Sequence, residues 1–141
     1  MEVCCDAPKL LRRPEYRERY AGYEPPEELL AALRNIHRPM TVLVVFGYWC
    51  RDSVRIVPDV LKALALADNP DLQLLAIHVS YAETDPSPFM AGPIPVRRYP
   101  TIALLEGRFQ TAEEIPEGVE RLRFVEVPLD AGQIAALAQP Q

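Results

Sequence analysis

The sequence predicts an α/β domain: a mixed β-sheet with helices on both faces, in a three-layer α/β/α sandwich. Residues 41–46 form a run without polar alternation, typical of a strand buried on both faces of a parallel sheet, and residues 72–79 form a second apolar strand. A helical pattern joins these runs, and such a strand–helix–strand unit forms a right-handed parallel crossover. Residues 101–106 and 108–112 predict an antiparallel hairpin about Gly107. The sheet is therefore expected to have a parallel half and an antiparallel C-terminal half.

Composition limits the classes of function. The chain has 141 residues, 49% hydrophobic and 25% charged, as in an ordinary globular domain, and its 15 basic and 20 acidic residues give a net charge of −5. We therefore expect no nucleic-acid partner and no membrane partner. The N-terminal residues lack the apolar segment of a secretory signal, which predicts a cytoplasmic location. The three cysteines have no zinc-like spacing, so no metal site is expected.

The remaining segments complete the predicted domain. Residues 1–23 are predicted to be an N-terminal arm or short extra helix, ahead of a domain that spans residues 24–141. A helix should follow Pro26, and a final helix should occupy residues 129–139 with Asp130 as its N-cap. The proline-rich residues 80–99 predict a loop with one short helical turn, and residues 121–127 predict an edge strand.

A cysteine lies at the junction between the first buried strand and the helix that follows it. The apolar run ends at Gly47, Trp49 and Cys50 come next, and the helical pattern begins at about Asp52. A thiol at this position faces the free N–H groups of the helix and the positive end of its dipole, and both favour thiolate over thiol. Arg51 adds positive charge, whereas Asp52 opposes the anion. Cys50 is therefore the candidate nucleophile.

Two motifs resemble the active site of the thioredoxin superfamily. Trp49-Cys50-Arg51-Asp52-Ser53, with Pro58 in the following helix, is similar to the W-C-x-x-C segment. Arg98-Tyr99-Pro100-Thr101, followed by an apolar strand and Gly107, is similar to the cis-proline loop. The resemblance covers residues 41–109 and implies a thioredoxin-like fold, a catalytic cysteine and a cis bond before Pro100 beside that cysteine. It also assigns substrate binding to Tyr99 and Pro100, and to Trp49, which can equally be a packing residue. Arg51 and Arg98 are further candidates for substrate binding; Arg98 could bind a carboxylate such as those of glutathione or could be a solvated loop charge.

The sequence departs from dithiol thioredoxins at two positions. Ser53 stands at the second cysteine, and Val44 stands where the dithiol proteins carry a buried acid. The resulting W-C-x-D-S pattern is similar to a monothiol, bacterial branch of thioredoxin-like proteins. Ser53 is assigned a catalytic role because its hydroxyl can donate a hydrogen bond to the thiolate; it can equally bond to backbone N–H groups at the helix start.

Two functions remain open at this point. The first is a monothiol thiol–disulfide oxidoreductase that acts through a mixed disulfide on Cys50. Its partner would be a disulfide-bearing protein or glutathione, with glutathione as co-substrate and no other cofactor. Cys4 and Cys5 are either terminal thiols or resolving thiols on the N-terminal arm. The alternative is a non-catalytic module that binds peptides or proteins. Peroxide reduction is less favoured, because Gly47 replaces the threonine of the peroxiredoxin motif.

Overall fold

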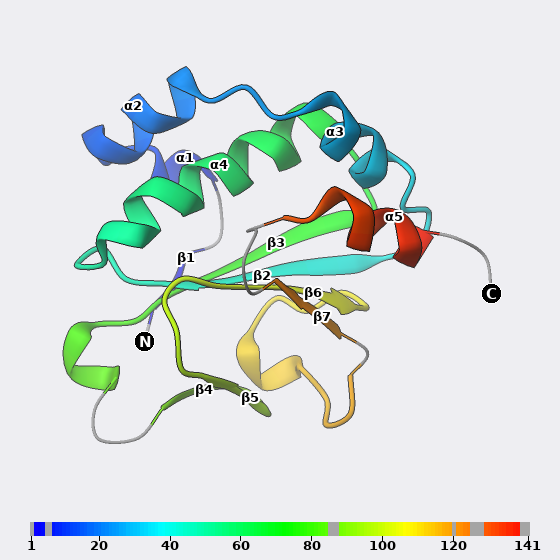
Figure 1. Ribbon diagram of the computed structural model, residues 1–141. Coiled ribbons are helices and arrows are strands. Elements are labelled where there is room, and N and C mark those ends of the chain that lie inside the picture. The colour runs from blue at the N-terminus through cyan, green and yellow to red at the C-terminus, as the bar shows by residue number, and fades with distance from the viewer. Residues whose placement is uncertain (1, 5–6, 85–87, 120, 125–128, 139–141) are drawn as a thin grey trace.

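The protein is built on a mixed five-stranded sheet (Figure 1). The computed structural model describes residues 2–4, 7–84, 88–119, 121–124 and 129–138. In spatial order the strands are β1 (Glu2–Cys4), β3 (Leu72–His78), β2 (Met40–Phe46), β6 (Thr101–Glu106) and β7 (Arg121–Phe124). Strands β2 and β3 are parallel, and the other neighbouring pairs are antiparallel. The predicted α/β fold with a mixed sheet is confirmed.

The helices gather on one face of the sheet (Figure 1). They are α1 (Ala7–Leu10), α2 (Pro14–Gly22), α3 (Glu27–Arg34), α4 (Arg51–Ala67) and α5 (Ala131–Ala138). Asp130 begins α5 as predicted, since its Oδ1 accepts a hydrogen bond of 2.9 Å from the Gln133 N–H. The opposite face carries a small second sheet, β4 (Phe89–Ala91) and β5 (Ile94–Val96), and two short 3₁₀ turns, η1 (Tyr81–Thr84) and η2 (Ala112–Glu114).

Strand β2 is the centre of the core, and every residue in it is buried. Val42, Val44 and Phe46 pack into the cluster under the helices, whereas Leu43 and Val45 pack into the cluster under β4 and β5. This division follows from the alternation of side chains along a strand. Burying each such side chain stabilises the fold by about 1.5–3 kcal/mol, so an apolar residue is favoured at every position.

The N-terminal residues share the core of the domain. We expected residues 1–23 to form an arm or short helix ahead of the domain. Strand β1 instead pairs with β3 at the sheet edge, and Leu10 and Tyr16 are fully buried. The Arg19 guanidinium also binds both carboxylate oxygens of Asp59 on α4, at 2.9 Å each. The segment therefore packs as part of the same unit as the rest of the chain.

The proline-rich segment after β3 contains more structure than a loop with one helical turn. Besides η1, it forms the hairpin of β4 and β5, in which Ala91 lies opposite Ile94. Gly92 makes the turn with a φ of 58°, and a Cβ there would lie 2.4 Å from the Ala112 carbonyl oxygen. The prediction missed the hairpin because its strands are three residues each and β5 contains Pro95.

The predicted hairpin of residues 101–106 with 108–112 is wrong. Strand β6 pairs with β2 and β7, and the chain after Gly107 forms no strand before η2. The buried Thr41 hydroxyl donates to the Gly107 carbonyl at 2.7 Å and accepts from the Phe109 N–H at 3.1 Å. These bonds occupy the Gly107 carbonyl and the Phe109 N–H, which would otherwise be free to pair in the predicted hairpin. The predicted edge strand is confirmed as β7; residues 125–127 lie outside the described part.

Replacing Thr41 with valine tests this interpretation, because valine keeps the shape but removes the hydroxyl. We expect Thr41→Val to lower the free energy of unfolding by about 2 kcal/mol, since two backbone groups lose their partner. Urea unfolding measures the change. Thr41→Ser keeps the hydroxyl and is the matched control; a valine variant as stable as the wild type would contradict the interpretation.

Candidate functional site

The turn between β2 and α4 is held by short-range hydrogen bonds. Cys50 is the N-cap of α4, its N–H donates to the Gly47 carbonyl at 3.0 Å, and its own carbonyl accepts from Val54 at 3.3 Å. Ser53 is fully buried, and its Oγ accepts a hydrogen bond of 3.4 Å from the Gly47 N–H. Of the two roles considered for Ser53, this bond matches the one to backbone N–H groups. The bond fixes the turn that presents the thiol.

The two halves of the sequence motif meet at the sulfur of Cys50. The Cys50 thiol donates to the backbone carbonyl of Tyr99 at 3.4 Å, across a sequence separation of 49 residues. The peptide bond between Tyr99 and Pro100 is cis. Cys50, Tyr99 and Pro100 are all partly exposed, so solvent and substrate can reach the place where the segments meet.

Aromatic side chains form an exposed surface next to this meeting point. The Trp49 indole N–H donates to the Val79 carbonyl at 2.8 Å, which holds the ring, although 41% of the residue remains exposed. Tyr81 and Tyr99 pack against the indole at centroid distances of 5.2 and 5.4 Å. Sequence reasoning missed Tyr81, which is 69% exposed. The sequence did contain a signal for Tyr81: it follows β3 closely, and the ends of the parallel strands β2 and β3 place it at the same edge of the sheet as Cys50.

The arginines expected to bind substrate face solvent. Arg51 and Arg98 are both exposed, and neither forms an ion pair within the described segments of the chain. Asp52, which would oppose an anion at Cys50, pairs instead with Arg55 at 3.1 Å. Both free guanidinium groups are thus available to a carboxylate, but their roles stay predictions.

The structure places Cys4 at the far edge of the sheet from Cys50. In the register of the strands, Cys4 lies opposite Ala76, which in turn lies opposite Val44. Cys4 is therefore two strand spacings, roughly 10 Å, from Val44 on β2. A role of Cys4 as resolving thiol stays a prediction. Cys5 lies outside the described residues.

A cluster of aromatic and charged groups lies beneath the turn. Tyr16 packs at 6.4 Å from the Phe46 ring and 5.9 Å from the Tyr48 ring. The Arg13 guanidinium lies 3.3 Å from the centre of the Tyr48 ring, and His78 stacks on that ring at 4.3 Å. The sequence alone did not single out Tyr16, because nothing in the local pattern places it beside this turn.

Burial raises the pKa of the Tyr16 phenol well above its usual value. The charges that Tyr48 and Cys50 can carry act on this pKa in the same direction, while Arg13 opposes them. Tyr16 is therefore a neutral phenol at physiological pH, within electrostatic range of Cys50.

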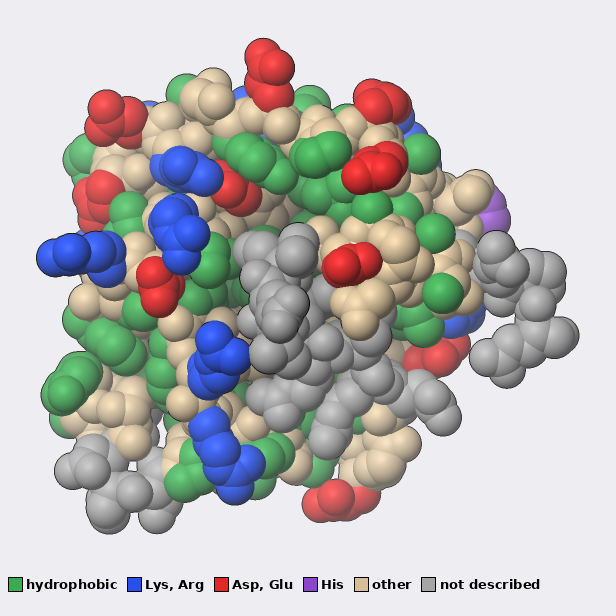
Figure 2. All heavy atoms as spheres, viewed as in Figure 1, with side chains coloured by type: hydrophobic (Ala, Val, Ile, Leu, Met, Phe, Trp, Pro, Cys, Tyr) green, Lys and Arg blue, Asp and Glu red, His purple; other side chains and the backbone are tan. Residues whose placement is uncertain are grey.

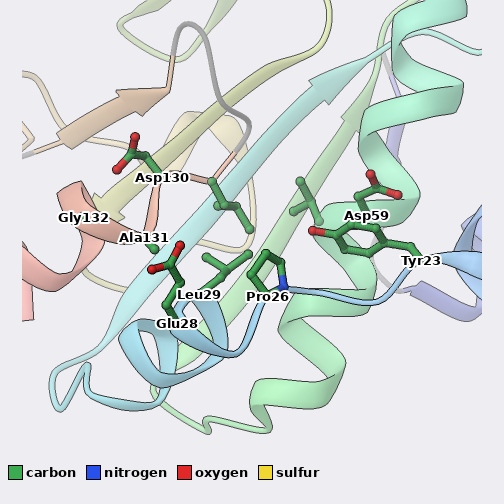
Figure 3. A pocket seen from close by; sticks show the side chains of 10 residues that line it. Tyr23, Pro26, Glu28, Leu29, Asp59, Asp130, Ala131 and Gly132 are labelled. Atoms are coloured by element: carbon green, nitrogen blue, oxygen red, sulfur yellow. The ribbon is translucent and has the colours of Figure 1, made fainter.

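A separate cavity of about 390 Å³ opens between α3, α4 and the start of α5 (Figure 3). Leu29, Val60 and Leu129 give it apolar walls, and none of the residues predicted for the site lines it. The surface seen in Figure 2 carries acidic and basic side chains interspersed with hydrophobic ones. The site at Cys50 is thus an exposed surface rather than this cavity.

Two further properties concern the described residues only. Among residues 2–4, 7–84, 88–119, 121–124 and 129–138, no three His, Cys, Asp or Glu side chains are grouped so that they could hold a metal ion. No helix in the same segments has the length and apolar character needed to cross a bilayer.

The fold and the meeting of a helix-capping cysteine with a cis-proline loop define a thioredoxin-fold protein. A family model described as thioredoxin matches residues 4–85, which is more than half of the chain and includes the Trp49–Ser53 motif. The chain belongs to the thioredoxin family. No curated protein and no solved structure matches it significantly.

Gly47 is expected to be essential for the position of the indole. A Cβ at Gly47 would lie 2.3 Å from the Trp49 ring, so Gly47→Ala should displace the ring and break its bond to Val79. Trp49 is the single tryptophan, so its fluorescence reports the change as a shift of emission to longer wavelength. Gly22→Ala is the matched control, because a Cβ there meets nothing within 4 Å. Unchanged emission in the Gly47 variant would contradict the prediction.

Proposed function

We propose that the protein is a monothiol thiol–disulfide oxidoreductase of the W-C-x-D-S type, in which Cys50 is the nucleophile. One observation carries the proposal: Cys50 is the N-cap residue of α4, and its partly exposed thiol donates to the backbone carbonyl of Tyr99. The helix terminus favours the thiolate, which is the attacking species, and the Tyr99 segment offers a backbone where a substrate can bind.

The proposed reaction is an exchange of disulfides in two steps. The Cys50 thiolate attacks one sulfur of a substrate disulfide, forms a mixed disulfide, and releases the other substrate sulfur as a thiolate that takes up a proton. A second thiol, such as that of glutathione, then attacks the substrate sulfur of the mixed disulfide. Cys50 leaves as a thiolate, and the substrate now forms a disulfide with the second thiol. No net oxidation occurs in the exchange.

An external thiol is proposed for the second step, because Ser53 stands where dithiol thioredoxins carry the second cysteine. The Ser53 hydroxyl cannot form a disulfide and is bonded to the Gly47 N–H. Cys4 lies in β1, opposite Ala76. This step fits a cytoplasmic setting, in which glutathione is the abundant thiol. We assign no other cofactor to the reaction.

Residues around Cys50 provide the features that a substrate needs. An extended peptide or the cysteinyl part of glutathione can pair with the backbone of Tyr99 and Pro100, and Trp49 offers an apolar surface. The exposed guanidinium groups of Arg51 and Arg98 suit the carboxylates of glutathione.

A second function is favoured by one specific observation. The exposed surface of Trp49, Tyr81 and Tyr99 can bind an apolar peptide without any redox step. A non-catalytic binding module would keep this surface, with Cys50 as a passive thiol. The two functions differ in whether Cys50 forms a mixed disulfide that is then released.

Trapping the intermediate separates these functions. Incubation with oxidised glutathione should add one glutathione to Cys50, and reduced glutathione should remove it, both followed by intact-protein mass spectrometry. A Cys4→Ser/Cys5→Ser background isolates the reaction of Cys50, and an added Cys50→Ser substitution is the control. No adduct on Cys50, or an adduct formed only as fast as on an unfolded cysteine peptide, would favour the binding module.

The missing second thiol should limit turnover with protein disulfides. In insulin reduction by dithiothreitol, we expect the wild type to be close to the uncatalysed rate, and Ser53→Cys to be faster by about tenfold or more, because an adjacent thiol can resolve the mixed disulfide. Ser53→Ala removes the same hydroxyl without adding a thiol and is the matched control. Rapid wild-type turnover that persists after loss of Cys4 and Cys5 would contradict the monothiol assignment.

A further inference from the structure

The hydroxyl of Tyr16 has no hydrogen-bond partner within the described parts of the chain, although the residue is fully buried. A buried hydroxyl without a partner loses its bonds to water and gains nothing in return. Phenylalanine would fill the same space without that cost. The hydroxyl therefore calls for an explanation other than packing.

Tyr16 packs against the end of β2 and the turn that leads to the thiol used by the proposed function. It packs against Phe46, the last residue of β2, and against Tyr48 in the turn that leads to Cys50. It belongs to the same buried cluster as Val44, the residue at the position of the buried acid in dithiol relatives. Within the described residues, the helix-side core next to this turn thus contains the buried Tyr16 hydroxyl, which comes from α2.

The phenol keeps its proton at physiological pH, because burial opposes its ionisation. A neutral phenol in this position can donate a hydrogen bond but cannot act as a base. The charged or titratable groups that act on it are Tyr48, Arg13, Cys50 and Glu15, and His78 stacks on the far side of Tyr48. Arg51 and Asp52, which follow Cys50, are exposed.

The thiol and the thiolate of Cys50 need different partners. As a thiol, Cys50 donates to the Tyr99 carbonyl. Once ionised, the sulfur has no hydrogen to donate, and the negative end of the same carbonyl dipole repels it. The anion instead needs a donor, and the unpaired Tyr16 hydroxyl is one that the fold keeps protonated and dry.

We propose that Tyr16 is a positioning residue for the chemistry of Cys50: its buried hydroxyl turns toward the sulfur and stabilises the thiolate that attacks the substrate. The proposal rests on the proposed function, because it assigns the nucleophile a supporting donor.

The test is Tyr16→Phe in the Cys4→Ser/Cys5→Ser background, which removes only the hydroxyl. Thiolate formation is followed by ultraviolet absorbance, and Cys50 alkylation by iodoacetamide is measured across pH. We expect the midpoint of both profiles to move to higher pH and the alkylation rate at neutral pH to fall about three- to tenfold. The rates should converge at alkaline pH, where both proteins carry the thiolate.

Tyr20→Phe is the matched control, because it makes the same substitution on the same helix, at a residue whose ring lies near Lys62. It should leave both profiles unchanged. Identical profiles for Tyr16→Phe and the parent protein would overturn the proposal, even where Cys50 forms its mixed disulfide. Absence of a mixed disulfide in the parent would instead overturn the proposed function, so the two failures are distinguishable.

A second measurement avoids the substitution at Tyr16. With carbon-13 in the tyrosine rings, the Tyr16 resonance of the parent protein should shift with the same midpoint as Cys50 ionisation. The shift should be lost in Cys50→Ser. A Tyr16 resonance that does not shift when Cys50 ionises would overturn the proposal. Because this measurement uses the parent protein, the result does not depend on how a Tyr16 variant folds.

Discussion

The pairing of β2 on both of its edges is the constraint on which the site depends. Strand β2 is buried throughout, with β3 parallel on one edge and β6 antiparallel on the other. In the β6 register, Val45 lies opposite Thr101, so the residues just before Thr101 must lie beside the turn that follows Phe46. The contact of Cys50 with Tyr99 is thus a consequence of strand register. A slip of one residue would move Tyr99 away from the thiol and turn the core side chains outward.

Residues in the turn after β2 determine how the Cys50 thiol is presented. Gly47 leaves room for the indole of Trp49, and the Ser53 hydroxyl accepts a hydrogen bond from the Gly47 N–H. Cys50 caps the helix with its backbone in an extended conformation, while its side chain reaches the Tyr99 carbonyl. The turn can therefore present one thiol but holds no second thiol to resolve a disulfide, and this limits the proposed chemistry to exchange with an external thiol.

The sequence was sufficient for the parts of the fold that local patterns encode. The apolar runs predicted β2 and β3, the helical period predicted α4, and the resemblance placed Tyr99 and Pro100 beside Cys50. Two features that the sequence did not predict depend on tertiary contact. Thr41 controls the chain after Gly107 from a distance of 66 residues, which no local pattern reveals. The burial of Tyr16 under the turn likewise depends on how α2 packs on α4.

We propose that the fold makes Cys50 a nucleophile by stabilising its thiolate. The most direct measurement is the rate of Cys50 alkylation at neutral pH in the native protein and in the same protein unfolded in urea, with the modified position identified by mass spectrometry. We expect faster alkylation in the native state, because the helix terminus stabilises the thiolate only when α4 is formed. This effect should outweigh the reduced access to the sulfur in the folded protein. An equal or slower rate in the native protein would contradict the claim.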